Sequence, residues 1–209
     1  SGDLAPFAHL ALPVIGEGWV LSDDGSVIEA SVALERAGIE PLVLEPKEGL
    51  SLLNGTEGML AQGCLAVHRA ETLADTADAA CALSVEALMG SSRPFDPRIH
   101  ALRPHDGQRI SAARIAALLE GSQIDASHHD DFTHKVQDAY SLRCAPQVHG
   151  AVRDTIAHAR NVLSIELGSV VDNPIVFAGD GDVVSGGNFH GQPLAFVLDF
   201  LAIAITELG

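Results

Sequence analysis

Three polar side chains spaced three residues apart carry the strongest chemical signal in this sequence. Gln137, Tyr140 and Arg143 supply an amide, a phenol and a guanidinium. Residues at this spacing share one broad face of a helix or tight turn, so the three groups can address one ligand. The guanidinium fork matches a carboxylate, the phenol can donate or transfer a proton, and the amide can orient a partner. A helix-capping network with a surface arginine is the alternative, and the spacing alone favours neither.

Three more polar segments interrupt apolar stretches. They are residues 1–3, 53–55 and 187–190. Together with the segment 137–143 they make four polar segments, and three of the four lie at expected helix N-termini. Backbone N–H groups and the helix dipole favour negative charge at such ends. Several such ends converging on one point would make an electron-withdrawing pocket. Taken singly, Asp3 is a plausible helix N-cap and Phe189 a core aromatic residue at a helix start.

The elements that must position these segments are mainly helices. Apolar periodicity and stop signals predict helices at residues 4–15, 29–37, 56–89, 107–119, 146–167 and 193–208. Short apolar runs flanking residues 23–25 and 179–181 predict two β hairpins, and residues 120–131 are expected to form a polar loop. The predicted fold class is mainly α: a long-helix bundle with two minor hairpins, residues 1–209 forming a single piece.

Composition excludes several classes of function. With 47% hydrophobic residues, 209 residues can bury a substantial core. Twelve Lys and Arg against twenty-eight Asp and Glu give a formal charge of −16, which argues against nucleic acid and anionic lipid as partners. The most apolar stretches are shorter than the roughly 20 residues of a membrane span. The chain is therefore expected to be soluble. Three scattered cysteines predict a reducing compartment, the cytoplasm.

A metal site is not expected. The densest cluster of possible ligands is His128, His129, Asp130, Asp131 and His134. It lacks the His-Glu-x-x-His pattern of catalytic zinc sites, so a solvated acidic loop is the better interpretation. The first residues carry neither an initiator methionine nor a signal peptide, and the last helical pattern stops without a polar tail. Both ends are therefore expected to be cut from a longer chain.

Several segments occur in the order and at the spacing of one known family. They are residues 1–9, 53–56, 137–144, 146–147, 172–174 and 187–190. On these segments the chain closely resembles the histidine ammonia-lyases, which belong to the aromatic amino acid ammonia-lyases. The matches span nearly the whole chain and suit the central helical region of that family.

The resemblance implies an electrophile made from the polypeptide itself. In the family, an Ala-Ser-Gly tripeptide cyclises and loses water to form 4-methylidene-imidazol-5-one. Ser1 and Gly2 match its last two members, and Asp3 matches the position that assists ring closure. No alanine precedes Ser1 in this numbering, so the isolated piece is expected to be unable to form the group and to be inactive.

The resemblance also assigns the remaining site residues. The substrate amine adds to the electrophile, a base removes the β-proton and ammonia departs, so histidine would give urocanate. Ser1, Gly2, Asn54 and Tyr140 are the implied catalytic residues. Arg143, Gln137 and Phe189 are the implied substrate-binding residues, with Arg143 on the carboxylate. The family's general base, a tyrosine before the tripeptide, is not in this chain.

Two alternatives remain open. One is a sibling tyrosine or phenylalanine ammonia-lyase or aminomutase, and the other is a non-catalytic fragment of a helical assembly. The Ala-rich helices offer more apolar face than this piece can cover, which favours self-association. The resemblance implies a homotetramer whose active sites are drawn from more than one subunit.

Overall fold

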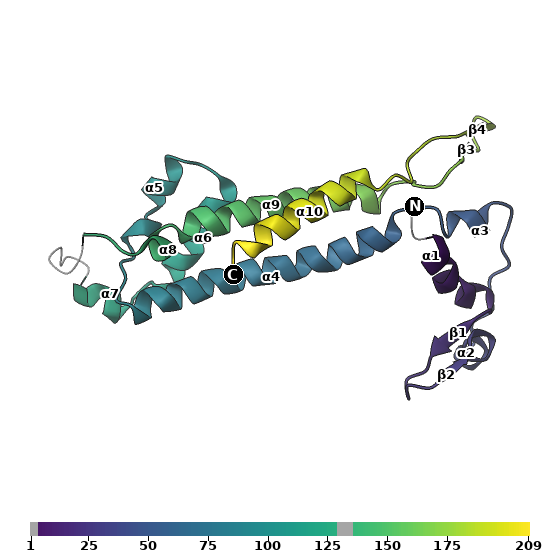
Figure 1. Ribbon diagram of the computed structural model, residues 1–209, viewed down its shortest axis with the longest axis horizontal. Helices are drawn as coiled ribbons and strands as arrows, with labels where there is room; N and C mark the ends of the chain where they lie inside the picture. Colours follow the sequence, from purple (N-terminus) through teal and green to yellow (C-terminus); the bar gives the residue numbers. More distant parts are fainter. Residues whose placement is uncertain (1–3, 129–135) are drawn as a thin grey trace. The chain divides into compact units, whose positions relative to one another are not determined.

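The computed structural model describes residues 4–128 and 136–209, and this part of the chain is mainly helical (Figure 1). It also contains two small antiparallel sheets of two strands each. The chain divides into two compact units, which are described separately. Unit 1 comprises Ser1–Ala61 and Leu167–Gln192, and unit 2 comprises Gln62–Glu166 and Pro193–Gly209.

Unit 1 holds the two hairpins and the shorter helices. Its first segment forms α1 (Leu4–Ala11), the 3-10 turn η1 (Leu12–Ile15), β1 (Trp19–Leu21), β2 (Val27–Glu29), α2 (Ala30–Ala37) and α3 (Glu48–Ser51), and its second forms β3 (Ile175–Phe177) and β4 (Asp182–Val184). Trp19 pairs with Glu29 in the first hairpin and Ile175 with Val184 in the second. Gly16 and Gly38 end η1 and α2 in the left-handed conformation that glycine adopts readily. Both predicted hairpins are therefore confirmed.

Unit 2 is built from long helices. Its elements are α4 (Glu57–Ala87, beginning in unit 1), the 3-10 turn η2 (Arg93–Phe95), α5 (Pro97–Ala101), α6 (Asp106–Leu118), α7 (Gln123–His128), α8 (Tyr140–Arg143), α9 (Ala145–Leu167) and α10 (Gln192–Thr206). The long helices predicted at 56–89, 107–119, 146–167 and 193–208 are confirmed within two residues at each end. The polar loop predicted at 120–131 is wrong for residues 123–128, because the Ser122 hydroxyl accepts from the Asp125 N–H at 2.9 Å and caps α7.

The helices of unit 2 approach each other closely at glycines. A Cβ atom on Gly150 of α9 would lie 2.3 Å from the backbone of Gln108 in α6. One on Gly63 of α4 would lie 2.8 Å from a methyl carbon of Leu163 in α9. Neither distance leaves room for a side chain, so glycine at these positions permits the tight crossing of the helices.

A buried ionic network joins three helices of unit 2. The carboxylate of Asp78 on α4 is fully buried. It accepts hydrogen bonds from His149 Nδ1 at 2.9 Å and Arg153 Nη2 at 2.6 Å, both on α9, and lies 3.3 Å from Arg114 Nε on α6. Burial alone would raise the pKa of Asp78, but the hydrogen bonds from His149 and Arg153 outweigh it and hold that pKa below its ordinary value.

Replacing Asp78 is expected to destabilise the protein strongly. Asp78→Asn leaves the cations of α6 and α9 without their buried counter-charge, a loss of about 3–5 kcal/mol in the free energy of unfolding. Because the folded pKa is depressed, the stabilisation is present above the unfolded pKa of about 3.9 and is lost as pH falls through the lower folded value. Denaturant unfolding of the full-length protein at pH 7 and at pH 3 measures both effects.

Asp75→Asn is the matched control for Asp78→Asn. Asp75 contacts the same two arginines, yet its side chain is 49% exposed. Ion pairs at exposed positions contribute about 1 kcal/mol or less. Equal losses for the two variants at pH 7 would show that burial of Asp78 is not what makes it important.

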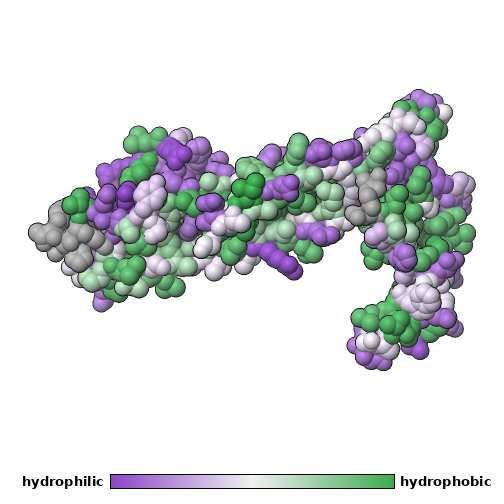
Figure 2. Space-filling model, in the orientation of Figure 1, coloured by the Kyte–Doolittle hydropathy of each residue, from purple (hydrophilic) through white to green (hydrophobic). Residues whose placement is uncertain are grey.

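Apolar side chains remain uncovered on the helices of unit 2, as the green areas of Figure 2 show. On α10 they form a stripe of Phe196, Phe200 and Ile203, spaced four and three residues apart. Among the described residues, no helix combines the length and the apolar character needed to cross a membrane. An exposed apolar stripe on a helix is typical of a surface covered by another protein segment.

Candidate active site

The expected site residues fall into three groups. Ser1, Gly2 and Asp3, the implied precursor of the electrophile and its neighbour, lie outside the described residues. The other five are divided between the units: Gln137, Tyr140 and Arg143 in unit 2, Asn54 and Phe189 in unit 1.

The segment that carries Tyr140 and Arg143 is fixed from both sides. α8 is a single helical turn, and Leu142 within it is buried in a hydrophobic cluster that includes Phe95. Before the turn, the buried carboxylate of Asp138 accepts a hydrogen bond from the Ser91 N–H at 2.7 Å. Tyr140 and Arg143 therefore project from an anchored turn.

Gln137 lies in the bend before α8 and not on the helical turn itself. The shared face expected for all three residues thus holds for Tyr140 and Arg143 only. The helical hydrogen bonds begin at Ala139, whose carbonyl oxygen accepts from the N–H groups of Leu142 and Arg143 at 3.1 and 3.2 Å.

Arg143 presents a guanidinium suited to an anionic ligand. Its side chain is half-buried, its Nε donates to the backbone oxygen of Asp138 at 3.2 Å, and its Cζ lies 5.1 Å from the centroid of the Tyr140 ring. No carboxylate in the described part of the chain forms an ion pair with it, although the chain carries a net charge of −16. The Tyr140 side chain is 70% exposed, which leaves its phenol open to a ligand.

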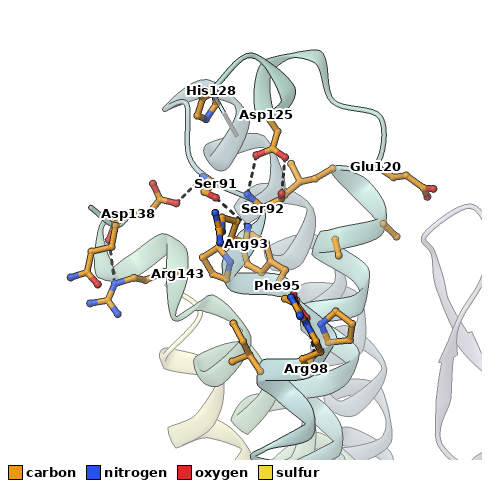
Figure 3. Close-up of a pocket in the computed structure, with 18 of the residues that line it drawn as sticks. Ser91, Ser92, Arg93, Phe95, Arg98, Glu120, Asp125, His128, Asp138 and Arg143 are labelled. Carbon is orange, nitrogen blue, oxygen red and sulfur yellow. Dashed lines mark hydrogen bonds and ion pairs between the residues drawn. The ribbon is translucent and has the colours of Figure 1, made fainter. Parts of the chain in front are cut away.

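A hollow of about 1390 Å³ adjoins this segment in unit 2. It is lined by residues from the segments 91–102, 116–128 and 136–143, and these include Gln137 and Arg143 but not Tyr140. Figure 3 shows two contacts at the edge of the hollow. The Ser92 hydroxyl donates to the Asp125 carboxylate, and Arg143 Nε donates to the backbone oxygen of Asp138. The hollow exceeds the usual 300–1,000 Å³ of small-molecule pockets, so its volume is no measure of a substrate.

Asn54 belongs to a polar network in unit 1 that the sequence did not reveal. Its Nδ2 donates to Oδ1 of Asp172 at 3.2 Å, and the other oxygen of Asp172 accepts from Ser51 Oγ at 2.6 Å and from Lys47 Nζ. Burial alone would raise the pKa of Asp172, but the hydrogen bonds from Lys47, Ser51 and Asn54 outweigh it and place that pKa far below its ordinary value. Asp172 is therefore a carboxylate at neutral pH.

Phe189 is half-buried in a turn of unit 1. The segment 187–190 lies directly before α10, which begins at Gln192, one residue before its expected start at Pro193. The turn is tied to the chain after α9, since Asn188 Nδ2 donates to the Val170 oxygen at 3.1 Å and the Gly186 N–H donates to Asn173 Oδ1 at 2.7 Å. Residues 170–173 thus contact both the turn that carries Phe189 and the side chain of Asn54.

The possible metal ligands are spread apart in the described part of the chain. No group of three or more His, Cys, Asp or Glu side chains there could hold a metal ion. His128 shares a hydrogen bond with the Gly90 oxygen at 2.9 Å, while His129, Asp130, Asp131 and His134 lie outside the described residues.

Comparison with known proteins decides to which family this arrangement belongs. The family model described as aromatic amino acid lyase matches residues 1–209. The chain belongs to the aromatic amino acid lyase family. The histidine ammonia-lyase of Anaeromyxobacter sp. (strain K) is 55% identical over the whole chain, which spans 42% of that protein's length.

Solved structures of lyases and aminomutases share the fold. The tyrosine aminomutase from Streptomyces globisporus superposes with a TM-score of 0.91 at 46% identity, over 99% of this chain and 42% of that one. The histidine ammonia-lyase from Trypanosoma cruzi superposes with a TM-score of 0.85 at 45% identity, over 99% of this chain and 38% of that one. The mainly helical fold with two hairpins is thus that of part of an ammonia-lyase or aminomutase.

Proposed function

We propose that the full-length protein containing this chain eliminates ammonia from L-histidine to give urocanate. The observation that carries the proposal is the 55% identity, over the entire chain, to proteins named histidine ammonia-lyase. This chain spans 42% or less of their length. Under this proposal, it is the central helical region of a longer polypeptide.

The 4-methylidene-imidazol-5-one group used by this family would form from Ser1, Gly2 and a preceding alanine. When formed, it supplies an electrophilic carbon that captures the amino group of the substrate. The described residues fit such a group, since Asn54 offers a partly exposed amide held at one end by Asp172, and Phe189 offers a half-buried ring. An amide and an aromatic ring are suitable neighbours for a small, planar, polar heterocycle.

The unit 2 residues bind and orient the substrate. Arg143 receives the carboxylate, because two parallel N–H···O bonds from a guanidinium match that group and no protein carboxylate in the described chain competes. Tyr140, beside the guanidinium and open to solvent, offers its hydroxyl to exchange a proton with the substrate. Gln137 adds an amide to the same segment. Asp3 would assist ring closure next to the tripeptide.

The proposed partner is a second copy of the chain in a homotetramer. The exposed stripe of Phe196, Phe200 and Ile203 on α10 supports self-association, because such a surface is costly to leave in water. The three scattered cysteines support a reducing compartment, the cytoplasm. The net charge of −16 argues against nucleic acid and anionic lipid as partners.

Activity on tyrosine is the second candidate. It is favoured by the TM-score of 0.91 and 46% identity to a tyrosine aminomutase, values similar to those for the Trypanosoma cruzi enzyme. The residues that choose between an imidazole and a phenol ring are not among those assigned in this chain.

Product analysis separates the candidates. We expect the purified full-length protein to release ammonia and urocanate from L-histidine, with kcat/KM at least about a hundredfold higher than for L-tyrosine or L-phenylalanine. Coumarate, cinnamate or a β-amino acid as the main product would replace the proposal by the second candidate. If none of the three amino acids gives a product, the remaining interpretation is a non-catalytic helical assembly.

A further inference from the structure

The carboxylate of Asp172 gathers donors from one short segment of unit 1. Lys47, Ser51 and Asn54 lie at and after α3, and all three donate to Asp172, which follows α9. Its two oxygens are used differently. Oδ2 takes the ammonium and the hydroxyl, and Oδ1 is left for the amide of Asn54.

The backbone at Lys47 is adapted to this arrangement. Lys47 has φ +78°, in the left-handed region that residues with a side chain rarely adopt. It stands directly before α3, and its carbonyl oxygen accepts from the Ser51 N–H at 3.1 Å. A strained residue persists where surrounding contacts over-determine its conformation, and here those contacts bring the ammonium onto Asp172.

A carboxylate partner can fix the direction of an amide. Asn54 has a donor and an acceptor at the two ends of its side chain, and a rotation of 180° exchanges them. Rotation would place Asn54 Oδ1 against Oδ1 of the Asp172 carboxylate, where two acceptors repel. Because Nδ2 faces Asp172 at 3.2 Å, Oδ1 of Asn54 is directed away from the carboxylate.

We propose that Asp172 is a positioning residue, which locks the Asn54 amide so that its carbonyl oxygen accepts a hydrogen bond from the amino group of the substrate. Lys47 and Ser51 hold the carboxylate in place for this purpose. The inference rests on the proposed function, because it assigns a task to Asn54 in the same reaction.

The ionic character of Asp172 is essential to the lock. A neutral acceptor such as an amide can itself rotate, and it then accommodates either orientation of Asn54. Asp172 keeps its charge at neutral pH because the hydrogen bonds from Lys47, Ser51 and Asn54 outweigh burial in setting its pKa. The lock is therefore expected to hold at neutral pH, and to weaken only in acid below the ordinary range of a carboxyl pKa.

The test uses Asp172→Asn, which keeps the size of the side chain and removes its charge. In the full-length protein we expect kcat to fall about tenfold to a hundredfold while KM changes little. Asp182→Asn makes the same chemical change on an exposed strand of unit 1 and is expected to leave kcat unchanged. Loss of kcat in both variants, or in neither, would overturn the proposal.

A double-mutant cycle tests whether Asp172 acts through Asn54. Once Asn54→Ala has removed the amide, adding Asp172→Asn is expected to lower kcat no further, whereas independent roles give losses that multiply. The near-ultraviolet absorbance of the electrophile is expected to persist in Asp172→Asn. Multiplying losses, or loss of that absorbance, would show that Asp172 does not act by positioning Asn54.

Neutron diffraction distinguishes the nitrogen from the oxygen of an amide, and it gives a readout that needs no activity. We expect one orientation of the Asn54 amide in the wild-type protein and a reversed or mixed orientation in Asp172→Asn. An unchanged single orientation in the variant would contradict the lock. Absence of ammonia release by the wild-type protein would refute the proposed function instead, so the two failures are distinguishable.

Discussion

Ser1→Ala in the full-length protein is expected to lower kcat for ammonia release about a thousandfold or more. Alanine has no hydroxyl group to lose as water, so the methylidene carbon cannot form at this position. Without an electrophile, a poor leaving group must depart from carbon while a weakly acidic β-proton is removed, and no residue assigned in this chain replaces that covalent assistance. Turnover of L-histidine and near-ultraviolet absorbance measure the effect together.

The matched control is Ser164→Ala on α9. Within the described residues, the hydroxyl of Ser164 donates only to the backbone oxygen of Arg160, at 2.8 Å, on an exposed face of the helix. This variant is expected to keep both the absorbance and the turnover of the wild-type protein. Substantial turnover in Ser1→Ala would show that Ser1 is not a precursor of the catalytic group, and it would contradict an electrophile made from the polypeptide itself.

Arg143→Ala is expected to lower kcat/KM for L-histidine about a hundredfold. A bidentate, charge-assisted pair with the substrate carboxylate is lost, and such hydrogen bonds contribute about 1.5–3 kcal/mol each. The fold is expected to remain intact, because the hydrogen-bond and ring partners of Arg143 in the described chain are only a backbone oxygen and the Tyr140 ring. Steady-state kinetics and thermal unfolding of the full-length protein test both statements.

Histidinamide, which lacks the carboxylate, tests whether Arg143 acts on that group of the substrate. The wild-type protein is expected to prefer histidine strongly over histidinamide, and Arg143→Ala is expected to lose most of that preference. Arg160→Ala is the control, since Arg160 forms an exposed pair with Glu71. If Arg143→Ala still prefers histidine over histidinamide, the substrate carboxylate is bound by a residue other than Arg143.

The helices and hairpins were predictable because their signals are local. Apolar periodicity and the glycines at 16 and 38 marked elements that the structure contains. α7 was missed because its six residues are too few to show an apolar period, although the hydroxyl of Ser122 caps its start. Propensity is a weak guide for such short helices, whose existence depends on their surroundings.

The site was predictable where its residues are close in sequence. Tyr140 and Arg143 stack as their spacing of three suggested. The hydrogen bond from Asn54 to Asp172 joins residues 118 positions apart, and no local sequence pattern predicts it. Contacts of this kind depend on how distant segments pack, which a periodic pattern does not encode.

The mass of the peptide that contains Ser1, taken from the full-length protein as purified, tests the central claim most directly. Cyclisation and loss of the serine hydroxyl remove two water molecules in all, so an Ala-Ser-Gly segment is predicted to be lighter by two waters than its sequence requires. An unmodified mass in protein that converts histidine to urocanate would contradict an electrophile built from Ser1 and Gly2.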